Sequence, residues 1–258
     1  RKKQYQPDAQ AKENAVSREE AELSFACASG WCLRFGLAAL LLFSLTAASS
    51  AQEKAAAAFR PPASALEVLS KYDIGESQLG NFYSGQPLGR AAEEVLAKIL
   101  YRWPRLGQEY IEEWRRKGVT WDQLVADSVA HRGEIFHFRG RVTQVAKVTL
   151  TPEVAERMEF DHYYAANIKI QDSPSVALVY ARYIPISWKV DTEMDELVSV
   201  DGLFLKVGDN KADSPPLIFA AERIAWHPDK PHPEDFIGPD QVALAQAGVD
   251  WGLYEVVK

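Results

Sequence analysis

Apolar and polar residues alternate in a regular series between positions 131 and 226, and each run there has the length of a β-strand. Alternation with a period of two is typical of strands that bury one face and expose the other. Turn residues separate five such runs, so the region predicts one small β-barrel. The expected strands are residues 134–145, 164–171, 176–184, 197–207 and 217–226.

Two of these strands contain a glycine where a strand interior usually carries a larger side chain. Gly140 lies in the first strand and Gly202 in the fourth. An isolated glycine inside a strand usually marks a bulge or a tight bend. The turn cluster 172–175 separates the second and third strands and predicts a hairpin between them.

Five strands in about a hundred residues, the two interior glycines, a long first connection and a tight hairpin resemble the OB-fold, a partly open five-stranded Greek-key barrel. The resemblance covers residues 133–226. The segments 138–142 (FRGRV) and 200–206 (VDGLFLK) also resemble OB-type domains of uncharacterised secreted bacterial proteins, a likeness that implies no particular activity. The expected fold class is therefore α+β, a five-stranded OB-like β-barrel preceded by a small helical module.

The helical module is expected at residues 63–130, where apolar residues recur at helical spacing. One helix is expected at 88–101, a second from Pro104 to about Lys117, and a short third one behind the capping residue Thr120. The large apolar side chains of these helices are expected to pack a helical layer against the barrel.

The stretch from Phe35 to Ala48 is almost continuously apolar, follows Arg34 and ends in small residues up to Ala51. This order is typical of a secretory signal peptide, expected at 33–51 and cleaved after Ala51. The run is shorter than the roughly 20 apolar residues of a membrane span. A membrane anchor through residues 35–48 is the alternative to a secreted or periplasmic location. If Leu33 is read as the initiating residue, residues 1–32 are an untranslated or disordered leader.

Removal of residues 1–51 changes both charge and cysteine content. Those residues hold six basic and five acidic side chains, so the remainder has 23 basic and 31 acidic residues, a net charge near -8. A negative domain is repelled by a phosphate backbone unless a local basic stripe overrides the net charge. Cys27 and Cys32 both precede the cleavage site, so the mature chain is expected to contain no disulfide.

The barrel is flanked by shorter segments. Residues 52–62 form an alanine- and proline-rich tether, and residues 227–237 form a proline-rich linker. Residues 238–258 show a new amphipathic pattern that loosely resembles 66–82, and they are interpreted as the start of a possible second helical module.

The linker contains a group of potential metal ligands: His227, Asp229, His232, Glu234 and Asp235. Three interspersed prolines are expected to keep the backbone extended, so that the side chains splay instead of converging as a tetrahedral site requires. His227 and His232 are therefore weak candidates, and no metal and no cofactor is expected.

A basic stripe is expected on the outer face of the barrel. OB-folds bind oligonucleotides or oligosaccharides on the face of strands two and three, where aromatic rings stack on bases. The alternative is that these side chains cover the outside of the barrel or pack under the helical module. The candidate ligand-binding residues are Arg139, Arg141, Lys169, Tyr180 and Arg182.

The sequence contains no phosphate-binding glycine loop, serine-nucleophile elbow, zinc-protease motif or Cys-x-x-Cys motif. We therefore expect no catalytic residues and interpret the chain as an exported, non-catalytic binding or scaffolding domain whose partner is a protein of the cell envelope. Two alternatives stay open: binding of a single-stranded nucleic acid or a glycan on the barrel face, and a hydrolase with an unrecognised site.

N-terminal sequencing of the exported protein tests the expected signal peptide. We expect a first residue near Gln52, because the small residues before it fit signal-peptidase cleavage. A membrane-bound form that starts upstream of Arg34 would instead indicate the retained anchor.

Overall fold

A computed structural model of the chain describes residues 60–209 and 215–257. The expected leader, the signal peptide, both cysteines and most of the tether lie outside these ranges. Within them, no helix is long and apolar enough to cross a membrane.

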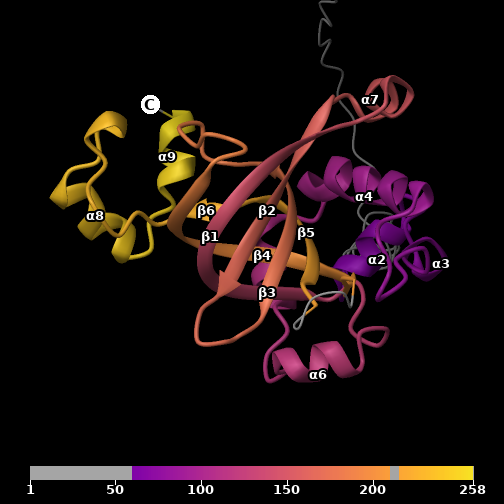
Figure 1. Cartoon of the computed structure of the whole chain (residues 1–258). Coiled ribbons are helices and arrows are strands. Elements are labelled where there is room, and N and C mark those ends of the chain that lie inside the picture. The colour runs from indigo at the N-terminus through magenta and orange to yellow at the C-terminus, as the bar shows by residue number, and fades with distance from the viewer. Residues whose placement is uncertain (1–59, 210–214, 258) are drawn as a thin grey trace, which may run out of the picture. The chain divides into compact units, whose positions relative to one another are not determined.

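Six strands form a single sheet, and five of them are bonded into a ring (Figure 1). The order is β1-β2-β3-β5-β4, and β1 also pairs with β4, which closes the ring. The β3–β5 pair is parallel and the other pairs are antiparallel. The strands are β1 Ile135–Thr149, β2 His162–Ile170, β3 Val176–Tyr183, β4 Glu193–Val207, β5 Leu217–Arg223 and β6 Ala225–Trp226. The chain therefore has a mixed α+β structure whose ring is roughly barrel-like.

The expected strands are all present, but their ends differ from the prediction. β1 and β4 are 15 residues long each, because β1 continues along β2 to Thr149, opposite His162, and β4 begins at Glu193, opposite Gln144 of β1. The fifth expected strand is divided in two at Ile224, whose backbone N–H donates to the carbonyl of Tyr183 on β3.

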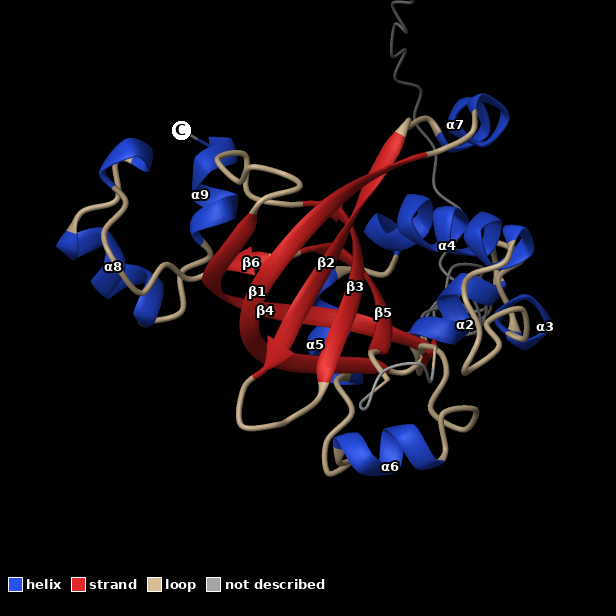
Figure 2. Cartoon of the chain, in the orientation of Figure 1, coloured by secondary structure: helices blue, strands red, loops and turns tan. Residues whose placement is uncertain are grey.

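The helices lie outside the ring (Figure 2). Those of the N-terminal module are α2 Ala65–Ser70, α3 Glu76–Leu79, α4 Arg90–Arg102, the 3-10 helix η1 Trp103–Arg105, α5 Gln108–Trp114 and α6 Trp121–Ala126. The others are α7 Pro152–Met158 between β1 and β2, η2 Pro233–Asp235, α8 Pro239–Gln246 and α9 Trp251–Val257. The single helix expected from Pro104 to Lys117 is interrupted at Gly107, which has a φ of 76° and precedes α5.

Apolar side chains form one core inside the ring and another on its outer surface. Inward residues of all five ring strands make the inner core, which includes Phe136, Phe138 and Phe219. The outer core joins α2, α4 and η1 to the outward residues of β3, β4 and β5. The expected helical layer against the sheet is therefore present.

The two interior glycines occupy positions with no room for a side chain. A Cβ at Gly140 would overlap the carbonyl oxygen of Lys169 and lie 2.6 Å from Ile168 Cγ2, and one at Gly202 would lie 3.0 Å from Phe219 Cβ. The bulges that their presence suggested occur a little further along each strand, where the register shifts between Val142 and Gln144 and between Phe204 and Lys206. The glycines thus permit close strand approach, and the neighbouring register shifts permit curvature.

A buried lysine of the ring forms hydrogen bonds with the N-terminal module. Lys206 is almost completely buried on β4, and its ammonium donates to the carbonyl oxygens of Tyr83, at 3.3 Å, and of Gln86. Burial lowers the pKa of Lys206. Because a buried ammonium needs such acceptors, the loop before α4 is held against the sheet.

Replacing Gly140 by Ala tests whether close strand approach limits the ring. We expect the free energy of unfolding to fall by about 1–3 kcal/mol, because the added methyl group overlaps backbone atoms of β2. Urea unfolding measures the change. Gly89→Ala is the control, since a Cβ there meets nothing within 4 Å; an equal loss in both variants would contradict the steric explanation.

Candidate binding site

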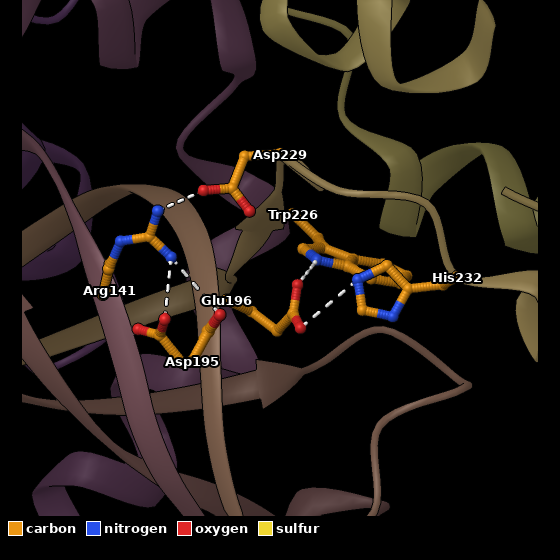
Figure 3. Close-up of polar contacts among 6 residues, drawn as sticks. All are labelled: Arg141, Asp195, Glu196, Trp226, Asp229 and His232. Atoms are coloured by element: carbon orange, nitrogen blue, oxygen red, sulfur yellow. Dashed lines mark hydrogen bonds and ion pairs between the residues drawn. The ribbon is translucent and has the colours of Figure 1, made fainter. Parts of the chain in front are cut away.

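The predicted basic stripe is divided by the structure. Arg139 and Lys169 lie exposed on the neighbouring strands β1 and β2, and neither forms an ion pair with another described residue. Arg141 is paired with two carboxylates, Asp195 at 3.2 Å and Asp229 (Figure 3). The hydrogen bond to Asp229 contributes most to raising the pKa of Arg141. Arg141 is therefore neutralised within the chain, and two cations of the predicted stripe are left unpaired.

Tyr180 and Arg182 serve packing on β3. Tyr180 is half-buried against the outer core and meets the ring of Tyr163 edge-on at 5.7 Å. Burial raises its pKa to about 12. Arg182 lies 3.7 Å over the ring of Phe160 and donates to the carbonyl oxygen of His162. Neither ring of the tyrosine pair is free to stack on a base, and this arrangement agrees with the alternative that these residues pack under the helical module.

The proline-rich segment after β6 is held against β4 by polar contacts (Figure 3). Glu196 accepts a hydrogen bond from Trp226 Nε1 at 2.9 Å, and its other oxygen lies 3.4 Å from His232 Nε2. The expectation that the prolines keep this segment extended is wrong for Pro233–Asp235, which forms the 3-10 helix η2. As a result, potential ligand atoms of His232, Glu234 and Asp235 lie within 4.8 Å of one another.

His227 does not join that group. Its Nε2 lies 2.8 Å from the hydroxyl of Ser199, and its Nδ1 lies 3.1 Å from the carbonyl oxygen of Val249. A carbonyl can only accept, so Nδ1 carries a proton, and in the neutral ring Nε2 accepts from the serine hydroxyl. This is the starting arrangement of a serine nucleophile with its base, but a backbone carbonyl stands where a carboxylate usually orients the histidine.

A cavity of about 560 Å³ lies on the outer face of β4, β5 and β6, next to η1, α5 and α9. Its volume is within the range of small-ligand sites. Trp103 and Ile111 are buried beside it, whereas Tyr183 and Leu253 are 49% and 45% exposed. Its polar lining residues are Gln108, Ser199, Asp201, Glu222, Arg223 and Asp250.

Two carboxylates of this cavity are well bonded. Asp201 accepts two hydrogen bonds from Arg115, at 2.7 and 2.8 Å, and one from His137 at 3.0 Å. Burial acts to raise the pKa of Asp201, but the bonds from His137 and Arg115 outweigh it and hold this pKa below its usual value. Asp250 accepts from the backbone N–H groups of Trp226 and Leu253.

The third carboxylate, Glu222, has few groups nearby that stabilise its negative charge. Burial raises the pKa of Glu222, and the neighbouring Arg223 only partly opposes this. In the part of the chain that the structure describes, its side chain accepts no hydrogen bond. Arg223 itself lies 3.7 Å from Asp250. A half-buried carboxylate without a bonded partner, in a cavity of suitable size, marks a candidate binding site.

Comparisons with known proteins assign no function to this site. No protein-family model matches the chain, and no curated protein matches it significantly. The function must therefore be inferred from the chemistry of the cavity and its surroundings.

None of the ligand-binding residues predicted from the sequence lines the cavity. The sequence holds one local signal for the cavity: the charged residues Glu222 and Arg223 directly follow the apolar run that starts at Leu217. The contributions of α5 and α9 carried no comparable signal, because helical segments far apart in sequence meet only in the folded chain.

Replacing Glu222 by Gln tests whether burial raises the pKa of this carboxyl group. A folded-state pKa above the unfolded value means that the folded chain holds the proton more tightly. The free energy of unfolding should then fall as the pH rises from the ordinary glutamate pKa through the raised value, and this fall should be smaller in Glu222→Gln. Urea unfolding between about pH 4 and 8 measures it. The exposed Glu113→Gln is the control, and an unchanged pH profile in Glu222→Gln would contradict the assignment.

Proposed function

We propose that the chain is an exported, non-catalytic binding domain of the cell envelope that docks a basic side chain of a partner protein in the 560 Å³ cavity. The observation that carries the proposal is Glu222, a half-buried carboxylate without a bonded partner at the wall of that cavity. A lysine or arginine of a partner would supply the missing charge and hydrogen bonds.

The charge balance of the cavity favours a cationic guest. Among the described residues, three carboxylates line it, whereas Arg223 is the single cation that does so. Asp201 is already satisfied by Arg115 and His137 from outside the lining. Glu222 therefore remains an acceptor with unused hydrogen-bonding capacity, and a half-buried carboxylate is stabilised most by a charged donor.

The rim favours a protein over a free small cation. Tyr183 and Leu253 line the cavity and are exposed, and the nearby Ile186 and Tyr254 are exposed as well. Glu255 of α9 accepts a hydrogen bond from the backbone N–H of Ile186, which ties α9 to the segment after β3. Aromatic and aliphatic groups around a desolvated charged contact are typical of energetic centres in protein interfaces.

We infer that the ring is an OB-like barrel, because its strand order and the closure of β1 on β4 agree with that topology. The outward side chains of β3 pack against the helical module, with Leu178 and Tyr180 in the outer core. Binding of a nucleic acid or glycan on the face of β2 and β3 would therefore have to rely on Arg139 and Lys169, without the tyrosine platform.

Peptide binding tests the proposal directly. We expect the wild-type chain to bind synthetic peptides with a central Arg flanked by apolar residues, and Glu222→Gln and Tyr183→Ala to bind them about tenfold more weakly or worse, since a charged hydrogen bond or an aromatic contact is lost. Isothermal titration calorimetry measures the affinity. Tyr83→Ala is the matched control, because Tyr83 is an exposed tyrosine outside the cavity. Equal binding of a peptide with Gln in place of Arg would refute the cationic guest.

A hydrolase is the second candidate, because Ser199 lines the same cavity and is bonded to His227. In an acyl transfer, Ser199 Oγ would attack the carbonyl carbon while its proton passes to His227 Nε2 and then to the leaving group. Covalent labelling by a fluorophosphonate, lost in Ser199→Ala, would favour this candidate. If the chain is a non-catalytic binding domain, we expect no labelling of Ser199.

A further inference from the structure

We propose that the segment after β6 binds a zinc-class divalent ion through His232, Glu234 and Asp235, with Glu196 holding the histidine from behind. This inference concerns a different part of the molecule from the cavity and does not depend on the proposed function. It goes against the expectation from the sequence that these side chains splay.

The local backbone brings the three groups together. The 3-10 helix η2 begins directly after His232, and the N–H of Asp235 donates to the carbonyl of His232 at 3.0 Å. This turn places one potential ligand atom from each residue within 4.8 Å of the other two. Ligand atoms about 2.0–2.2 Å from a tetrahedral zinc ion lie roughly 3.4 Å apart. Small side-chain rotations would therefore close the site.

A second, independent observation is the state of the imidazole. His232 Nε2 is buried and makes no hydrogen bond within the described chain. It lies 3.4 Å from Glu196 Oε1, whose carboxylate is itself fixed by Trp226 Nε1. Nε2 therefore has Glu196 as its polar neighbour, and the ring nitrogen left for an ion is Nδ1.

The pair of Glu196 and His232 approaches the arrangement of a metal-bound histidine and its supporting carboxylate, with Nε2 and Oε1 3.4 Å apart. Histidine ligands usually direct the ring nitrogen that does not bind the metal to a carboxylate, which fixes the tautomer and the ring orientation. Here Nε2 faces Glu196, and Nδ1 lies on the side of the ring turned away from it (Figure 3). Nδ1 is thus left to bind the ion together with Glu234 and Asp235.

The surroundings leave space for the remaining ligands. A cavity of about 320 Å³ is lined by the three ligand residues and by Glu196. Ser187 and Trp188 also line it, and each has a buried polar atom with no hydrogen-bond partner in the described ranges. Waters that complete the coordination of the ion would have these groups to bond.

The donor set selects the kind of ion. One imidazole nitrogen and two carboxylate oxygens, with no thiolate, suit Zn²⁺ or Co²⁺. Ca²⁺ and Mg²⁺ prefer sites built from oxygen ligands alone. We therefore expect Zn²⁺ and Co²⁺ to bind and Mg²⁺ to bind much more weakly.

Metal titration of the full chain, purified without a histidine tag and stripped with a chelator, tests the site. We expect one Zn²⁺ per chain by calorimetry, and visible absorption bands on addition of Co²⁺. His232→Ala and the double variant Glu234→Gln with Asp235→Asn should each weaken binding at least about tenfold, and Glu196→Gln about tenfold through the histidine. His162→Gln is the matched control, because His162 also contacts a carboxylate, Asp161, but lies outside the cluster.

Thermal unfolding distinguishes a variant that has lost the metal site from one that fails to fold. An ion that binds only the folded chain raises the melting temperature. We expect Zn²⁺ to raise it in the wild type, in His162→Gln and in Glu222→Gln, but not in His232→Ala. Equal Zn²⁺ affinity of wild type and His232→Ala, or no Zn²⁺ binding by the folded wild type, would overturn the proposal. Failure of peptide binding by a chain that still binds Zn²⁺ would refute the proposed function alone.

Discussion

The pairing of β1 with β4 is the interaction on which the rest of the structure depends. It runs from Ile135 opposite Leu203 to Gln144 opposite Glu193 and converts a row of strands into a closed ring. Such closure requires strongly curved strands that approach one another closely. Gly140 lets β1 approach β2 closely. The register shifts after Val142 and Phe204 interrupt the regular pairing of the two long strands, which permits them to curve.

Once the ring is closed, its outer surface is divided among different neighbours. The N-terminal helices cover the outward faces of β3 and β5, with Lys206 fastening the loop before α4. The C-terminal segment packs around Trp226 through Ile237, Val242 and Trp251. The cavity adjoins the outer face of β4 at Ser199 and Asp201, and the candidate metal site adjoins the same strand at Glu196.

Most polar groups near β4 are satisfied inside the chain, and the exceptions are informative. Asp201 binds Arg115 and His137, and Arg141 binds Asp195 and Asp229. Glu222 and His232 depart from this pattern, because one is a half-buried carboxylate and the other has a buried nitrogen, each without a hydrogen bond among described residues. Partial burial of a charge without a bonded partner destabilises a folded chain, so Glu222 is expected where a ligand supplies the bond. At His232, Glu196 fixes the ring and leaves the other nitrogen for an ion.

The sequence by itself determined the strands, because alternation with a period of two is a local property that survives in the fold. It also indicated the importance of Gly140 and Gly202, and the helical layer before the ring. Only the tertiary structure decided which polar residues are available. Arg141 was expected to be free but meets Asp195, 54 positions away in sequence, and Tyr180 turned out to face the outer core. The packing of distant segments leaves the Glu222 carboxylate without a bonded partner among the described residues and sets His232 against Glu196. Local sequence cannot report this, because long-range contacts set both burial and pairing.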